Sequence, residues 1–400
     1  MPRLRWLAAT VIVSGLVTAG LAQPPAAPAP ATPAPAAPAP VQPPAAPATP
    51  APVKPVATPT VAPPAATPPA ATPPAATPPA ATPAVAPPAV VPPAVAPAGD
   101  KQQFLTKFEA NKPFFQKLTT KVEQTLKVQG GSDVPLKHEQ TFFFKWTPVS
   151  EDKGKWLVKQ TIEGVKFKLD IAGQTIDYDS TDTNPSGAAG NPGLAEFFKN
   201  LIGLEFTVTF AANNAIEKVD GRDEALKKLS AINPQMEAVL KTILSDEALK
   251  EMTDPSAGLA SAAAKGVNET WEKKSVLALG PIGSYDRTYA FTYKGKDADP
   301  AKKELDRVDV KPTLTYKPPA VGTESLPFRI KAGTMATKEV KQGYMLYNAK
   351  TGRTQEVRFH VIMEGELDVT IGMADTKVKL YQDQKNELDT ADTSFLPIKK

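Results

Sequence analysis

Residues 23–99 form a tract made almost wholly of proline, alanine, threonine and valine, which limits what this part of the chain can fold into. The tract holds 29 of the chain's 44 prolines, and Pro-Pro-Ala-Ala-Thr occurs four times in succession from Pro63 to Thr82. Each proline fixes φ, removes a backbone donor and turns the preceding residue away from helical geometry. Without aromatic residues the tract cannot bury enough apolar surface to offset its chain entropy. We therefore expect a disordered spacer.

As polyproline II, which rises about 3.1 Å per residue, such a tract extends on the order of 230 Å. This reach fits a spacer that holds a domain away from a membrane. The alternative is that the tract is itself a ligand for a proline-recognition domain. Such ligands usually carry a flanking basic residue, and the tract offers only Lys54.

The first 22 residues have the pattern of an export signal. Arg3 and Arg5 precede an apolar stretch over residues 6–17, and small residues lie before Ala22. We expect cleavage after Ala22 and a final location in the periplasm, at the cell surface or outside the cell. The alternative is an uncleaved leader, which would then be the chain's only membrane contact. The chain has no cysteine, so disulfides and lipid attachment at a cysteine are excluded.

Residues 100–400 have the composition of a globular domain with a nearly balanced charge. Arg3, Arg5 and Lys54 account for three of the 46 basic residues, which leaves 43 against 42 acidic ones. No run of Lys or Arg with interleaved aromatic residues is present in the sequence. The composition therefore argues against nucleic acid as a partner.

Apolar and polar residues alternate with a period of two in several stretches of this domain, which is typical of strands with one buried face. Leu118, Val122 and Leu126 share one parity, while lysines occupy the other. The strand patterns cover residues 118–128, 142–146, 165–171, 204–210, 285–293 and 357–363. Glycine-containing turns separate them at 130–131, 153–154 and 350–352, which favours antiparallel meanders.

Residues 221–266 instead carry apolar residues at helical spacing, and a short helix is also expected from Gly193 to Ile202. Ser245 is a candidate N-cap, and Asp254-Pro255 matches a cap followed by proline at the first helical position. Strands, a helical insert and strands again predict a β-rich α+β domain. The sheets are expected either as one curved sheet around the helical segment or as a sandwich-like pair.

A curved sheet of this kind would have a concave face lined by apolar and aromatic residues, which could hold an apolar ligand. The chain contains 16 Phe, 8 Tyr and 4 Trp. The alternative is that these side chains simply fill the core.

Signatures of catalysis and cofactor binding are missing from the sequence. The two histidines, His138 and His360, lie within strand patterns and far from any cluster of ligating residues, so we expect strand surface or core positions. The absence of cysteine excludes thiolate chemistry, and no phosphate-binding, dinucleotide or nucleophile-elbow motif is found. We predict neither a cofactor nor a catalytic residue.

Asp177, Asp179 and Asp182 are weak candidates for a metal site, because their oxygens could serve calcium. An EF-hand loop that starts at Asp177 would need glycine at its sixth position and glutamate at its twelfth, where the chain has Asp182 and Ala188. Turn chemistry at the end of a strand explains the run adequately.

Several short motifs in a fixed order resemble an uncharacterised family of secreted bacterial proteins, classed as a domain of unknown function. The resemblance covers residues 101–395. It rests on Gln-Thr-Ile-Asp-Tyr-Asp-Ser at 174–180, residues 201–208, Val219-Asp220-Gly221, residues 244–252, Gly266-x-x-x-x-Trp271, residues 288–295 and Tyr347-x-x-x-x-Gly352. It implies an export signal but no activity or site residues, and the family does not require the Pro/Ala tract.

These observations lead to the hypothesis of an exported, non-enzymatic protein of the cell envelope. Its domain would bind an envelope protein or an apolar ligand, or act as a structural module on a Pro-rich spacer. The alternative is a hydrolase of envelope polymers that uses two carboxylates about 5 to 10 Å apart in one cleft.

Overall fold

The structure is a computed structural model that describes residues 101–182, 192–232, 237, 240–241, 244–260, 263–279, 282–319, 328–371 and 374–397. The predicted signal peptide and spacer, residues 1–99, lie outside the described residues, so these two predictions stay untested.

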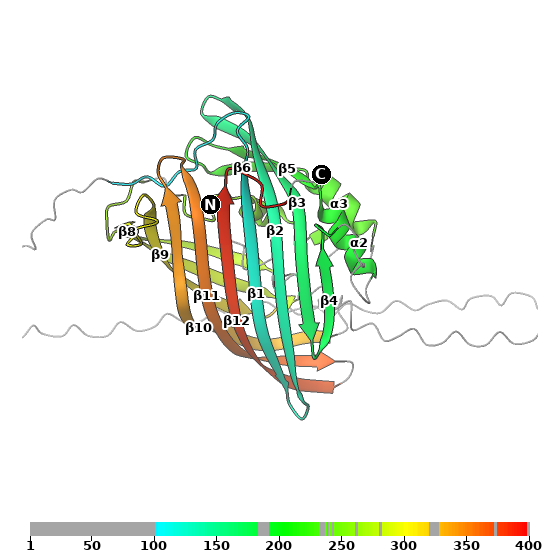
Figure 1. The fold of residues 1–400 in the computed structure, drawn as a ribbon. Coiled ribbons are helices and arrows are strands. Elements are labelled where there is room, and N and C mark those ends of the chain that lie inside the picture. The colour runs from blue at the N-terminus through cyan, green and yellow to red at the C-terminus, as the bar shows by residue number, and fades with distance from the viewer. Residues whose placement is uncertain are drawn as a thin grey trace, which may run out of the picture. The chain divides into compact units, whose positions relative to one another are not determined.

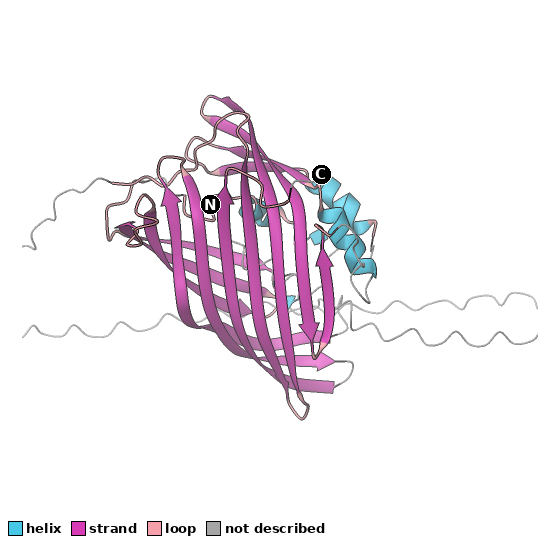
Figure 2. Cartoon of the chain, in the orientation of Figure 1, coloured by secondary structure: helices cyan, strands magenta, loops and turns pink. Residues whose placement is uncertain are grey.

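The described part of the domain contains twelve strands and three helices (Figure 2). The strands are β1 (Phe114–Val128), β2 (Asp133–Asp152), β3 (Lys155–Ile171), β4 (Gln174–Asp179), β5 (Glu205–Phe210), β6 (Ile216–Asp220), β7 (Thr270–Ala278), β8 (Ser284–Lys296), β9 (Asp306–Lys317), β10 (Phe328–Asn348), β11 (Arg353–Ile371) and β12 (Ala374–Ala391). The helices are α2 (Pro192–Leu201), α3 (Arg222–Ser230) and α5 (Asp246–Met252). The predicted β-rich α+β class is confirmed.

All twelve strands belong to one antiparallel sheet, in the order β6-β5-β3-β2-β1-β12-β11-β10-β9-β8-β7, with β4 paired to β3. Most neighbours are consecutive in the chain, as the predicted meanders require. There are two exceptions. Strand β3 pairs with β5 as well as with β4, and at the centre of the sheet β1 pairs with β12 from Phe115↔Ala391 to Val128↔Val378. The predicted alternatives are thereby resolved in favour of one sheet.

The period-two pattern places one side of each central strand in the core and the other in water. In β1, Leu118 and Val122 are 3% exposed, while Lys121 and Glu123 between and beside them face solvent. The predicted turns at 130–131, 153–154 and 350–352 all connect adjacent strands. Gly154 has a φ of +79°, a conformation that glycine adopts without strain.

The sheet is strongly curved (Figure 1). Strands β8 and β9 pass behind β11, β12 and β1, while α2 and α3 lie beside the opposite edge at β3 and β4. The rings of Tyr289 on β8 and Phe359 on β11 lie 6.2 Å apart although β9 and β10 separate these strands in the sheet. The inner, concave face therefore carries the core of the domain.

The helical insert lies where the sequence predicted it, with one correction. Ser245 caps α5 as expected, since its Oγ accepts a hydrogen bond from Ala248 N at 3.3 Å. The prediction of a second helix at Asp254-Pro255 is wrong, because residues 255–258 form a turn. Asp254 still accepts bonds from Ser256 N and Gly258 N, at 2.9 and 3.1 Å, so its carboxylate caps a tight turn instead of a helix.

Candidate functional site

The inner face of the sheet is divided into three levels along strand β1. Gln116 lies at the upper level, Thr120, Val122 and Gln124 form the middle level, and Leu126 and Val128 lie at the lower level. Each level continues onto the neighbouring strands through the antiparallel register. The chemistry differs at each level.

At the upper level, polar side chains of the sheet hold the loop that follows α5, residues 253–258, which we call the plug loop. Gln116 Nε2 donates to Pro255 O at 2.9 Å, and Trp146 Nε1 donates to Gln116 Oε1 at 2.8 Å. Thr354 Oγ1 donates to Ser256 O at 3.0 Å. The buried amide and hydroxyl groups at this level are therefore paired with plug-loop backbone.

Strands β7 and β8 hold the same segment from across the concavity. Arg287 Nη2 lies 2.8 Å from Glu251 Oε2 in an ion pair whose side chains are 0% and 7% exposed. Lys273 Nζ donates to the carbonyl of Gly258. Burial raises the pKa of the neighbouring Tyr289 to about 12, so this phenol stays protonated. Both walls of the concavity thus contact the plug loop.

At the middle level, nine residues on three adjacent strands form a grid on the inner face. The registers Gln140↔Thr120↔Asn386, His138↔Val122↔Gln384 and Leu136↔Gln124↔Gln382 define its rows. Only Leu136 and Val122 are apolar. We call the other seven the inner polar patch: Thr120, Gln124, His138, Gln140, Gln382, Gln384 and Asn386. From strand spacing and rise the grid measures about 10 Å by 13 Å.

The inner polar patch is buried but incompletely hydrogen-bonded. Gln382 Nε2 donates to Gln384 Oε1 at 2.7 Å, Gln384 Nε2 donates to Asn386 Oδ1 at 3.3 Å, and Thr120 Oγ1 donates to the same oxygen at 3.1 Å. Among the described residues, no partner is found for five atoms of the patch. These are Asn386 Nδ2, both polar atoms of Gln140 and both ring nitrogens of His138.

Five such atoms are a substantial cost to the fold, because a buried polar group without a partner destabilises by about 1–3 kcal/mol. His138, Gln140 and Asn386 are only 2%, 1% and 3% exposed. Burial also lowers the pKa of His138 to about 4, so its imidazole is neutral at neutral pH. The patch is therefore an uncharged, buried group of polar side chains with unused hydrogen-bonding capacity.

The lower level is an apolar collar in which large side chains remain partly exposed. Leu126 pairs with Leu380, and Val128 pairs with Val378, which in turn pairs with Leu367. We call the partly exposed apolar side chains at this level, together with Ile171 beside Leu136, the lower collar: Leu126, Val128, Ile171, Phe328 and Leu367. Polar groups set deep in an apolar lining are the usual composition of a small-molecule site.

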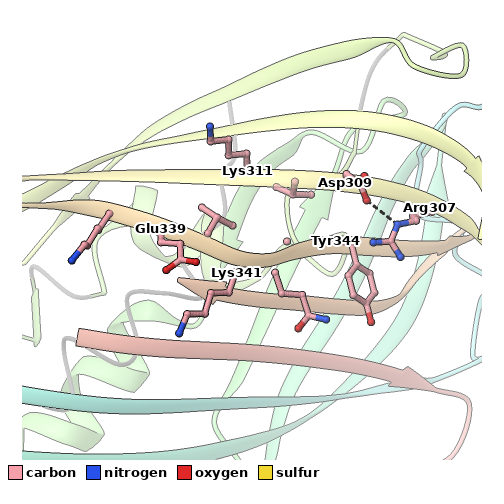
Figure 3. A pocket seen from close by; sticks show the side chains of 11 residues that line it. Arg307, Asp309, Lys311, Glu339, Lys341 and Tyr344 are labelled. Atoms are coloured by element: carbon pink, nitrogen blue, oxygen red, sulfur yellow. Dashed lines mark hydrogen bonds and ion pairs between the residues drawn. The ribbon is translucent and has the colours of Figure 1, made fainter. Parts of the chain in front are cut away.

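A second concavity lies on the outer face, between β9 and β10 (Figure 3). The register jumps from Ala336↔Thr315 to Tyr344↔Asp309, so residues 310–314 of β9 lie opposite residues 337–343 of β10. The resulting groove has a volume of about 750 Å³. Such a register shift is a β-bulge, which bends the strand and changes the direction of its side chains.

The charged groups of this groove are largely paired with neighbours. Arg307 Nε lies 2.8 Å from Asp309 Oδ1, and its guanidinium lies 4.4 Å from the centre of the Tyr344 ring. Lys341 Nζ lies 3.8 Å from Asp383 on β12. The hydrolase hypothesis requires two carboxylates on one concave surface, and Asp309 and Glu339 both line this groove. Figure 3 shows Asp309 directed at Arg307, away from Glu339.

A third concavity of about 510 Å³ lies where residues 102–108 cross the ends of β3 and β10. Phe108 and Trp156, whose ring centres are 5.8 Å apart, line it together with Tyr347. Tyr347 Oη donates to Leu105 O at 2.6 Å and thereby fixes the crossing segment to β10. The pocket is therefore explained by the packing of the crossing segment against β10.

The three aspartates predicted as weak metal candidates lie at the end of β4 and in the turn after it. Asp179 Oδ1 accepts from Thr181 N at 2.8 Å, and Asp179 Oδ2 lies 2.8 Å from Lys166 Nζ. Burial acts to raise the pKa of Asp179, but the bonds from Lys166 and Thr181 outweigh it and lower the pKa. Asp177 is exposed on β4, and Asp182 N donates to Asp179 O at 3.2 Å. The Asp179 carboxylate thus serves a turn and an ion pair.

No group of three or more His, Asp or Glu side chains with the arrangement of a metal site occurs among the described residues. Both histidines lie on strands, as predicted. His138 lies in the core on β2, and His360 lies on the outer face of β11 with Nε2 2.8 Å from Asp383 Oδ1.

The inner polar patch was not predicted, although the sequence carries a signal for it. Gln382, Gln384 and Asn386 repeat with a period of two between Leu380 and Leu388, which continue the same parity. Uncharged polar residues in phase with buried leucines mark a polar stretch on the core side of a strand.

Comparison with known proteins agrees with the expected resemblance to an uncharacterised family, over a shorter stretch than predicted. Residues 153–302, which run from β3 through β8, match the model of a family of unknown function, DUF6263. No curated protein matches the chain. Within the described part of the chain, none of the helices has the length and apolar character needed to span a bilayer.

Similarity to solved structures is weak. A lipovitellin structure described by its lipid–protein interactions is 10% identical, with a TM-score of 0.36; the match covers 74% of this chain and 26% of that chain. The chain thus spans about a quarter of lipovitellin. OccK5 of Pseudomonas aeruginosa is 7% identical, with a TM-score of 0.17 and coverage of 72% and 100%. At these TM-scores the likeness carries no inference about this chain.

Proposed function

We propose that this domain is a non-enzymatic binding module that holds an apolar ligand against the inner face of its sheet. The observation that carries the proposal is the set of five partnerless polar atoms, on His138, Gln140 and Asn386, that lie buried on the inner face next to the apolar lower collar. A ligand that reaches the patch would use this hydrogen-bonding capacity. The lower collar offers the apolar surface for the rest of the molecule.

We further propose that the module is exported and works in the cell envelope, on a flexible Pro-rich spacer. The basic and apolar leader and the Pro/Ala tract support this location, on sequence grounds alone.

The binding proposal is tested with N-phenyl-1-naphthylamine, an uncharged apolar fluorophore, titrated into the purified full chain. We expect saturable binding to one site. Leu126→Arg, in the lower collar, is expected to weaken binding by at least about tenfold, because it places a charge in the apolar lining. Thr125→Arg is the matched control, since the adjacent residue of β1 has the opposite parity and lies on the outer face.

Two results would contradict the proposal. The first is a lack of saturable fluorescence with the native chain. The second is an equal loss of affinity in both arginine variants, which would mean that the probe does not bind at the collar. Either result would favour a protein partner as the ligand of this domain.

A further inference from the structure

The partnerless atoms of the inner polar patch specify what kind of polar group a ligand can place there. The amide of Gln140 offers two N–H donors and an acceptor oxygen, and Asn386 Nδ2 offers further N–H donors. Neutral His138 adds one donor and one acceptor. Flipping the Gln140 amide or changing the His138 tautomer leaves these numbers unchanged, so the patch requires a group that both donates and accepts.

The surroundings of the patch favour a ligand group without a charge. None of the seven patch residues is charged, and burial of a bare carboxylate or ammonium without a partner costs several kcal/mol. The charged residues that alternate with the patch lie on the outer face and pair there. Lys121 lies 3.0 Å from Glu139, and Asp383 lies 2.8 Å from His360.

Three charged residues of the opposite wall and of α5 are already used by the fold. Arg287 and Glu251 neutralise each other at 2.8 Å, and Lys273 donates to the plug-loop carbonyl of Gly258. They belong to the upper level, which the plug loop fills. A charged ligand group at the middle level would therefore lack a counter-ion among the described residues.

The position of the patch also orients the ligand. It lies between the plug loop above and the lower collar below, and the collar is the partly exposed end of the inner face. A molecule with one polar end would place that end at the patch and its apolar part along the collar.

We propose that the inner polar patch binds the uncharged donor–acceptor head group of a single-chain amphiphile, such as a primary amide or a hydroxyl. This inference rests on the proposed function and specifies its ligand class. It excludes carboxylate and ammonium head groups.

The test uses the full chain with bound N-phenyl-1-naphthylamine, displaced at pH 8 by three amphiphiles with the same alkyl chain. Dodecanamide is neutral, dodecanoate is negative and dodecylammonium is positive. We expect dodecanamide to bind at least about tenfold more tightly than either ion, which corresponds to about 1.4 kcal/mol.

The variant that assigns the preference to the patch is Gln140→Leu. It removes hydrogen-bonding atoms that have no partner among the described residues, so the unliganded variant is expected to fold at least as stably as the native chain. Its affinity for dodecanamide should fall about fivefold relative to its affinity for the fluorophore, which makes no hydrogen bond through an amide. Gln174→Leu is the matched control at an exposed glutamine of β4 and should change neither value.

The outcomes separate this inference from the proposed function. If neither the fluorophore nor any amphiphile binds, both the proposed function and this inference are wrong. If the fluorophore binds but dodecanoate or dodecylammonium matches dodecanamide, only the inference is overturned. An unchanged dodecanamide affinity in Gln140→Leu also overturns it.

Discussion

Burial of His138 in an uncharged site predicts how the stability of this domain depends on pH. The pKa of the imidazole falls from 6.5 to about 4 in the folded chain because burial penalises its charged form. The unfolded chain therefore takes up a proton at a higher pH than the folded chain does. The contribution of neutral His138 is complete above pH 6.5 and is lost as the pH falls toward 4.

The size of this effect follows from the shift. One pKa unit corresponds to about 1.4 kcal/mol, so the full loss is about 3 kcal/mol, of which about 2 kcal/mol is reached by pH 5. The variant His138→Gln removes the titrating group and keeps a neutral polar side chain in the patch. We expect its free energy of unfolding to fall less steeply with acid than that of the native chain. By pH 5 the loss in the variant should be smaller by about 2 kcal/mol.

The assay is urea unfolding followed by tryptophan fluorescence at intervals from pH 7.5 to pH 4.5. The control is His360→Gln, at the chain's other histidine, which should keep the steep acid loss because His138 is still present. Parallel stability curves for the native chain and His138→Gln would refute the reasoning, since they would mean that His138 is solvated in the folded state.

Three further outcomes are expected. Glu251→Gln should destabilise the domain by about 3–5 kcal/mol in urea unfolding, because it leaves Arg287 buried without its charge partner; a loss below about 1 kcal/mol would contradict this. Gly365→Ala should cost about 3 kcal/mol, since an added Cβ would lie 1.9 Å from a backbone oxygen of β10, whereas Gly266→Ala, with its nearest contact at 3.8 Å, should be close to neutral. N-terminal sequencing of the exported protein should yield Gln23, and Met1 or Pro2 would instead indicate a retained leader.

Much of the fold could be predicted from local patterns. The alternation around Leu118 and Val122 depends only on neighbouring residues, so strand β1 and its buried parity follow from the sequence, as does the cap at Ser245. The helix expected at Asp254 was wrong because the same capping carboxylate also stabilises a tight turn, and contacts to Gln116 and Thr354 select the turn.

The arrangement of the inner polar patch could not be predicted in the same way. Between Leu380 and Leu388 both parities of β12 are polar, so only the phase of these two flanking leucines indicates the buried face. Placing Asn386 next to Thr120 further requires the pairing of β1 with β12, which no local signal specifies. The burial of these amides is therefore a property of the tertiary structure.

The pairing of β1 with β12 also affects the order in which the domain can form. Phe115 and Ala391 are partners across 276 positions of the chain, so the centre of the sheet assembles only after every other strand has been made. Non-local pairings of this kind make folding slow, because loop-closure entropy is lost before the contacts form. A nascent chain that lacks residues 374–391 would leave β1 with an open edge, the kind of surface that recruits other strands. We therefore expect holding factors to protect this chain until its last strand is available.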